Sequence, residues 1–276
     1  MKFAVNTFVT DEGIRPDRLA VALEERRFDA LLLAEHSHIP VKRETPWPGG
    51  GELPRVYYRT YDPFVALAAA AAVTSTLRLG TAVALLAQRD LFQVAKEVAS
   101  VDRLSGGRVL FGVGAGWNRE EMRNHGTDPR TRGALLDEKL AAVKELWTRD
   151  EAEFHGSHVD FDPVFSWPKP VQRPHPPVYV GGESPAALAR LLRYGDGWLP
   201  RARTDLAELR RLSAWLADQR EGGVPATLCS VPMDAGKLAE YVELGVERVS
   251  FTLPTVPEAD TLRQLDQLAA LADEYR

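Results

Sequence analysis

Residues 100–126, SVDRLSGGRVLFGVGAGWNREEMRNHG, carry the pattern on which the expected fold depends. The segment predicts a helix end, a tight glycine turn at 106–107, a buried strand over 108–113 and a glycine-rich loop that opens another helix. In α/β proteins, ligands bind in the loops that follow the strands. Glycine at every second position of 112–116 removes side chains, so we expect a flat or phosphorylated ligand to approach the backbone there.

The same strand-then-helix pattern repeats along the chain, in roughly eight units. Short apolar runs bounded by turn residues are typical of buried parallel strands. The strands are predicted at residues 2–8, 29–34, 78–86, 108–113, 177–180, 197–199, 226–231 and 248–253. The pattern therefore predicts an α/β fold, a (β/α)₈ TIM barrel. Because we find no internal repeat and no low-complexity linker, we expect one domain over residues 1–276.

Two connections are longer than the usual loop, residues 35–61 and residues 150–176. Both are rich in proline and aromatic residues. Loops of this length in a compact domain are usually lids or binding loops. We expect both to lie near one end of the barrel and to cover the ligand.

Composition excludes several classes of protein. The chain of 276 residues has 45% hydrophobic and 26% charged residues and a formal net charge of −5, so nothing favours nucleic-acid binding. No segment resembles a signal peptide, and the longest apolar run, residues 64–73, is too short to span a bilayer. Cys229 is the only cysteine, which fits a reducing compartment, and we expect a cytoplasmic protein without membrane partners.

A second glycine motif follows the strand predicted at 177–180. Residues 181–185, GGESP, start a helix, and backbone N–H groups at a helix N-terminus bind phosphate well when glycine clears the approach. The same residues would also form an ordinary N-cap, and both interpretations stay open. The position at the carboxyl end of a barrel strand favours the phosphate interpretation.

Residues 35–38, EHSH, close the second predicted strand. A His-x-His pair can be half of the metal site of a hydrolase. Further metal ligands at later strand ends are not found, and we expect no metal. His36 is the candidate acid or base, since a barrel strand end is the right place and histidine titrates near neutral pH. His38 is equally well interpreted as a hydrogen-bonded structural residue.

Three other features have an expected place in the barrel. Trp117 follows the strand over 108–113 and is expected at the active-site mouth, where its ring can stack on a ligand. Asp102, Arg103 and Arg108 flank a helix-to-strand turn, which puts them at the opposite end, where they serve stability. Trp198 is expected to point into the barrel or up to its mouth.

The ordered combination of motifs resembles one family. LSGGRVLFGVGAGW (104–117), LLDEKLAAVKELW (135–147), FHG (154–156), a proline-rich segment ending in VYVGG (178–182) and YGDGW (194–198) are similar to the luciferase-like monooxygenase superfamily. More narrowly they resemble its actinobacterial branch of coenzyme F420-dependent oxidoreductases. This resemblance implies a (β/α)₈ barrel, usually dimeric, that holds FMN or F420 at the carboxyl ends of its strands.

The resemblance also implies roles for individual positions. His36 matches a histidine beside the reactive carbon of the cofactor. A cis peptide bond that does not involve proline is expected between Ala82 and Val83, behind the middle ring. The remaining cofactor-binding positions are Gly114, Ala115, Gly116, Trp117, Gly181, Gly182, Glu183 and Ser184. An aromatic substrate wall is expected from Phe8, Tyr57, Tyr58 and Trp117.

One position departs from the family pattern. Dehydrogenases of sugar phosphates and secondary alcohols carry a glutamate where Trp117 stands, which counts against those two reactions. The leading hypothesis is hydride transfer between F420 and a small organic substrate. The alternatives are an FMN-dependent monooxygenase supplied by a separate reductase, a non-catalytic flavin-binding protein, and a metal-dependent hydrolase.

Overall fold

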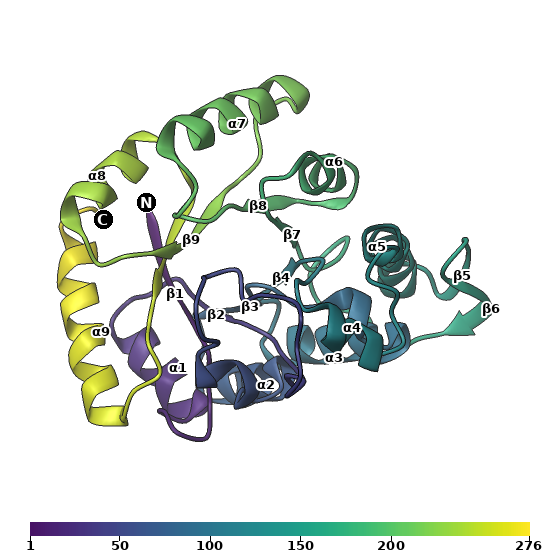
Figure 1. Ribbon diagram of the computed structural model, residues 1–276, viewed down its shortest axis with the longest axis horizontal. Helices are drawn as coiled ribbons and strands as arrows, with labels where there is room; N and C mark the ends of the chain where they lie inside the picture. Colours follow the sequence, from purple (N-terminus) through teal and green to yellow (C-terminus); the bar gives the residue numbers. More distant parts are fainter.

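A barrel of eight parallel strands forms the centre of the computed structural model, which describes residues 1–276 (Figure 1). The strands lie in the order β8-β7-β4-β3-β2-β1-β10-β9. Parallel bridges between Trp198 and Ala226 and between Arg201 and Cys229 join β8 to β9 and close the ring. The barrel strands are β1 (Lys2–Thr7), β2 (Ala30–Leu33), β3 (Arg78–Thr81), β4 (Val109–Val113), β7 (Val178–Gly181), β8 (Gly197–Leu199), β9 (Thr227–Val231) and β10 (Arg248–Thr252). The predicted (β/α)₈ barrel is confirmed.

Helices surround the barrel, and each strand is followed by one that packs outside it (Figure 1). Side chains of Asp62, Asp90, Ser184 and Asp205 accept backbone N–H bonds at the starts of four of them, as expected for N-caps. None of the helices is long and apolar enough to span a membrane. They are α1 (Pro16–Glu25), α2 (Pro63–Val73), α3 (Leu91–Leu104), α4 (Arg119–Asn124), α5 (Arg132–Thr148), α6 (Pro185–Tyr194), α7 (Leu206–Gln219), α8 (Ala235–Glu243) and α9 (Glu258–Asp273), with 3₁₀ turns η1 (Arg55–Tyr58) and η2 (Leu86–Gln88).

Side chains alternate along each strand between the barrel interior and the helix layer. In β4, Phe111 belongs to the large outer core, whereas Leu110 belongs to the small cluster inside the barrel. Trp198 of β8 lies in the outer core and Leu199 in the inner cluster. The expectation that Trp198 points into the barrel is therefore wrong, because the period-two alternation assigns the interior to Leu199. Its Nε1 donates to Gly182 O over 2.9 Å, at the carboxyl end of the barrel.

The third strand is shorter than predicted. It ends at Thr81, and the peptide bond between Ala82 and Val83 is cis, as the family resemblance implied. Leu85 N–H then donates to the Glu35 carboxylate over 2.8 Å instead of to a strand. Before that point the chain still pairs with β4, because Ala84 N donates to Gly112 O and Ala84 O accepts from Gly114 N. The apolar run continues to Leu86 in the sequence, but its backbone leaves the sheet after Ala84.

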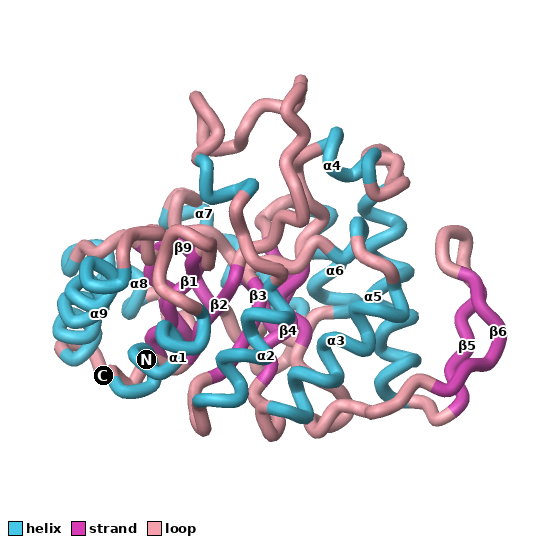
Figure 2. Tube along the Cα trace, turned by 90° about the horizontal axis from the view of Figure 1, so that it is seen from below, coloured by secondary structure: helices cyan, strands magenta, loops and turns pink.

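The segment 150–176 is no lid. It forms the antiparallel hairpin of β5 (Glu151–His155) and β6 (Asp160–Phe165), which stands beside α3 and α5 at the edge of the molecule (Figure 2). A connection from a helix to the next strand starts at the amino end of a barrel, away from the ligand end. The loop over 34–62 does follow a strand, and it extends beyond the carboxyl end of the barrel.

Candidate functional site

A cavity of about 370 Å³ opens at the carboxyl end of the barrel. Nine of the ten predicted cofactor-binding residues line it, and Trp117 is the one that does not. The nine are Ala82, Val83, Gly114, Ala115, Gly116, Gly181, Gly182, Glu183 and Ser184. Arg190, Leu199, Arg201, Cys229 and Ser230 also line it and were not predicted. The two glycine motifs, about 65 residues apart in the chain, thus border a single cavity.

Val83 explains why two of these positions are glycine. A Cβ atom at Gly114 would lie 2.5 Å from Val83 Cγ2, and one at Gly181 would lie 2.9 Å from Val83 Cγ1. Larger residues at either position would collide with the valine. These two glycines therefore make room for Val83, which lines the cavity together with them. That they also clear the backbone for a ligand stays a prediction.

A polar part of the cavity lining lies at the start of α6. Ser184 Oγ caps the helix by accepting from Ala187 N over 3.2 Å, and Gly182 has a φ of +107°, which favours glycine. Glu183 accepts from the backbone N–H and guanidinium of Arg201. Burial alone would raise the pKa of Glu183, but the hydrogen bonds from Arg201 lower it, so the carboxylate is charged. Arg201 is thus paired with Glu183, and the N-terminus of α6 is the feature of this wall that favours an anionic ligand group.

His36 forms a second part of the site, at the end of β2. Its Nδ1 lies 2.7 Å from Glu121 Oε2, and both side chains are almost fully buried. Trp117 Nε1 donates to His36 Nε2 over 3.3 Å. Because Nε2 accepts this bond, the ring carries its proton on Nδ1 and donates it to Glu121. The two contacts orient the His36 ring, and its Nε2 makes a single long hydrogen bond.

Aromatic rings surround this histidine. The Tyr57 ring lies 4.6 Å from Phe8, 5.2 Å from His36 and 6.2 Å from Trp117, measured between ring centroids. Trp47, which was not predicted, packs edge-on against Tyr57 at 5.9 Å. The structure brings together three members of the predicted substrate wall. Tyr58 is 54% exposed and makes no ring contact with them.

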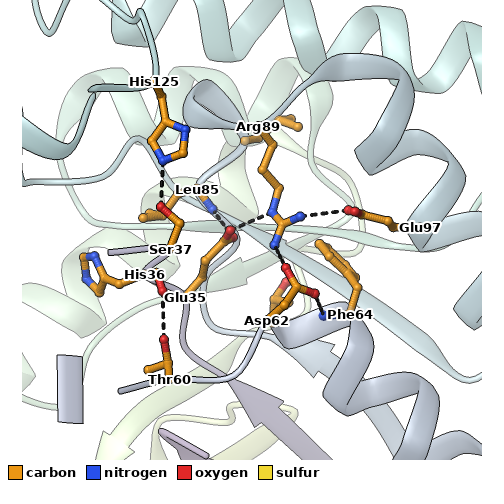
Figure 3. A network of polar contacts seen from close by, with 12 residues as sticks. Glu35, His36, Ser37, Thr60, Asp62, Phe64, Leu85, Arg89, Glu97 and His125 are labelled. Carbon is orange, nitrogen blue, oxygen red and sulfur yellow. Dashed lines mark hydrogen bonds and ion pairs between the residues drawn. The ribbon is translucent and has the colours of Figure 1, made fainter. Parts of the chain in front are cut away.

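A charged network supports the segment between β2 and β3 (Figure 3). Glu35 is buried and accepts from Arg89 Nε over 2.6 Å as well as from Leu85 N. Arg89 also contacts Asp62 and donates to Glu97 over 2.8 Å. Burial raises the pKa of Glu35, and the charge of Arg89 opposes that rise. The network fixes the backbone that follows the cis peptide bond at the cavity wall.

Glu121 is a candidate site residue that sequence reasoning missed. Its pattern, Asn118-x-x-Glu121, is that of a helix N-cap, and Asn118 Oδ1 does accept from Glu121 N over 3.3 Å. The glutamate side chain, however, turns to His36 instead of back to Asn118. The His-x-His pair also separates, because His36 faces Glu121 whereas His38 faces Ser37 and Asn124.

Comparisons with known proteins fit this geometry. The family model described as luciferase-like monooxygenase matches residues 15–227. An uncharacterised protein of Mycobacterium tuberculosis is 41% identical over 277 residues, which cover 98% of each chain. The F420-dependent hydroxymycolic acid dehydrogenase of that species is 29% identical over 81% of this chain and 60% of the enzyme. The FMNH₂-dependent dimethylsulfone monooxygenase of Pseudomonas putida is 38% identical over 37% of this chain and 29% of the enzyme.

The fold is also that of solved structures. The monooxygenase RslO1 from Streptomyces bottropensis matches with a TM-score of 0.83 at 20% identity, with 100% of both chains covered. At this identity the likeness concerns the fold alone.

Proposed function

The chain belongs to the luciferase-like monooxygenase family, and from that premise we propose that it is an F420-dependent oxidoreductase that transfers a hydride to or from a small organic substrate. The observation that carries the proposal is the buried His36–Glu121 pair, with its 2.7 Å hydrogen bond. His36 follows β2, which pairs with β3, and the cavity-lining residues Ala82 and Val83 follow β3. A hydride transfer to a carbonyl or from an alcohol needs a matching proton transfer. His36 Nε2 would accept the proton of the alcohol when the alcohol is oxidised, and the imidazolium so formed would return a proton to the carbonyl oxygen in the reverse reaction.

The residues of the cavity fit a flavin-type cofactor. Val83, held between Gly114 and Gly181, offers an apolar surface for one face of a ring system. The N-terminus of α6 also borders the cavity, and an anionic group would bind there. F420, when bound, would supply the hydride donor or acceptor. In this proposal Trp117, Ala115 and Gly116 lie between the cofactor and His36.

His36 would handle the proton through Nε2. The 3.3 Å bond from Trp117 is long, so a substrate hydroxyl can replace the indole N–H as its donor. Glu121 would then stabilise the imidazolium that forms, as a positioning residue on Nδ1. Phe8, Tyr57 and Trp117 would bind the apolar part of the substrate and exclude water.

An FMN-dependent monooxygenase is the second candidate. The similarity to the dimethylsulfone monooxygenase over 107 residues favours it. The same cavity would hold the FMN ring and phosphate, and a separate reductase would supply reduced flavin. In either case the proposal includes a homodimer acting on a small molecule.

Titration of the purified chain with F420 and with FMN, followed by fluorescence, tests the proposal. We expect F420 to bind more tightly than FMN. Ala115→Phe should abolish binding because it fills the cavity, whereas Ala217→Phe on exposed α7 should not change it. Submicromolar FMN binding without F420 binding would favour the second candidate. Failure to bind either cofactor would overturn both.

A further inference from the structure

Two histidines that are 87 residues apart in the chain meet beside Glu121. His38 follows β2, and His125 follows α4. One ligand atom from each of His38, His125 and Glu121 lies within 4.8 Å of the other two. Two imidazoles and a carboxylate are a donor set that binds zinc-type metal ions, with a fourth position left for water.

Both imidazoles converge on one point. Ser37 Oγ lies 2.9 Å from His38 Nδ1 and 2.6 Å from His125 Nε2, and Figure 3 shows Ser37 facing His125. The two ring nitrogens therefore face a shared partner. A metal ion can take the place of the hydroxyl, after the serine side chain rotates away.

The surroundings of His38 suit its use as a metal ligand. Its Nε2 lies 2.9 Å from Asn124 Nδ2, on the side away from Ser37. Turning the amide of Asn124 places its oxygen against Nε2, where it accepts that N–H and leaves Nδ1 as a lone-pair donor. Metal-bound histidines are usually oriented by such a partner on the second nitrogen.

The other two ligands are available in the required form. His125 is exposed, so its side chain can turn its Nε2 toward an ion. Glu121 uses Oε2 for His36, whereas Oε1 accepts only a 3.3 Å bond from Ser37 N. The carboxylate thus keeps a free coordination position.

A separate cavity adds an independent observation. Glu121, His125 and Ser37 line a polar cavity of about 230 Å³ that is distinct from the glycine-lined one. Gln88 lines the same cavity, is 7% exposed, and its amide has no hydrogen-bond partner in the protein. Buried amides are normally paired, so this one indicates room for a further polar group, such as a metal-bound water.

We propose that His38, His125 and Glu121 form a binding site for a divalent transition-metal ion of the zinc type. Ligands at 2.0–2.1 Å from such an ion lie about 3.4 Å apart in a tetrahedral site. The observed separations are up to 4.8 Å, and a rotation of the exposed His125 side chain brings them closer. The ion would tie the loop after β2 to α4. The site does not depend on the proposed cofactor.

Calorimetric titration of the chelator-treated chain with ZnCl₂ tests the proposal, with visible absorption of Co²⁺ as a second readout. We expect one equivalent to bind, a higher thermal midpoint and the spectrum of tetrahedral Co²⁺. His38→Ala and His125→Ala should each weaken binding by about tenfold or more. Ser37→Ala should retain binding, since the metal replaces that hydroxyl.

The hairpin histidines provide the control, because His155 and His158 are exposed at β5–β6, far from α4 (Figure 2). His155→Ala and His158→Ala should leave zinc binding unchanged. The proposal is wrong if no metal binds, or if the hairpin variants lose binding and the His38 and His125 variants keep it. His125 is exposed, so its variant is expected to fold.

Discussion

The two ends of the barrel differ in how completely their buried polar side chains are hydrogen-bonded by the protein. At the amino end, Asp102 is fully buried and accepts from Val171 N at 2.7 Å, Gln172 N at 2.9 Å and Gln172 Nε2 at 2.7 Å. At the carboxyl end lie all the buried side-chain atoms without a protein partner. They belong to Thr45, Gln88, Asn118 and Glu120, in segments that follow β2, β3 and β4.

The difference separates stability from binding. Arg108, also at the amino end, donates to the carbonyls of Ala71, Thr74 and Leu77, where α2 ends. The hydrogen bonds of Arg108 are thus made to other groups of the same chain. Unpaired groups cost free energy, so their concentration at one end indicates a surface that is completed by something other than the chain.

Asp102→Ala removes the acceptor of the hydrogen bonds at the amino end and has the largest expected effect on stability. It leaves the N–H groups of Val171 and Gln172 without their acceptor, and we expect a loss of about 3–5 kcal/mol in the free energy of unfolding. The midpoint of thermal unfolding should fall by on the order of 10 °C. Asp218→Ala, on exposed α7, is the control and should change it little. Equal midpoints for the two variants would refute the assignment.

The pH dependence of stability in Glu24→Gln tests a second set of hydrogen bonds at the amino end. Glu24 accepts from the N–H groups of Ser75, Thr76 and Leu77. Burial would raise its pKa, but these bonds lower it from 4.5 to about 2. The folded pKa lies below the unfolded one, so the stabilisation is complete above about pH 4.5 and is lost as the pH falls toward 2.

The thermal midpoint of Glu24→Gln should therefore lie below that of the wild type at pH 7, and the gap should narrow at pH 3. Glu25→Gln, at the neighbouring exposed position, should show no gap at either pH. A gap that stays constant between pH 7 and pH 3 contradicts this account.

Local patterns predicted the barrel better than they predicted its contacts. The periodicity of apolar residues in strands and helices shows which residues are buried. The alternation of strands and helices makes the strands parallel, so their carboxyl ends lie together. For this reason nine of the predicted cofactor positions line one cavity. The partner of a buried group is not a local property. Glu121 lies 85 residues from His36, and its sequence context is that of a helix cap. Likewise, no periodicity shows that Glu35 would accept from the N–H of Leu85.

Gln88→Met tests whether an unpaired polar group at the carboxyl end costs stability, and it has the smallest expected effect on the free energy of unfolding. The Gln88 amide is buried without a protein partner, so a thioether of similar volume removes an unsatisfied group. We expect the metal-free protein to gain about 1 kcal/mol in the free energy of unfolding, measured by urea denaturation. The sign is opposite to that for Asp102→Ala. Polar groups at the amino end stabilise the fold, whereas this one costs stability.

Gln93→Met is the matched control, because Gln93 borders the same polar cavity but is exposed. Its change in stability should be within about 0.5 kcal/mol of zero. If Gln88→Met is instead destabilising, the amide is paired in the metal-free protein, and the contrast between the two ends no longer holds at this position. If it is stabilising and also weakens zinc binding, the unpaired amide belongs to the proposed metal site, because the same group then costs folding free energy and contributes to binding.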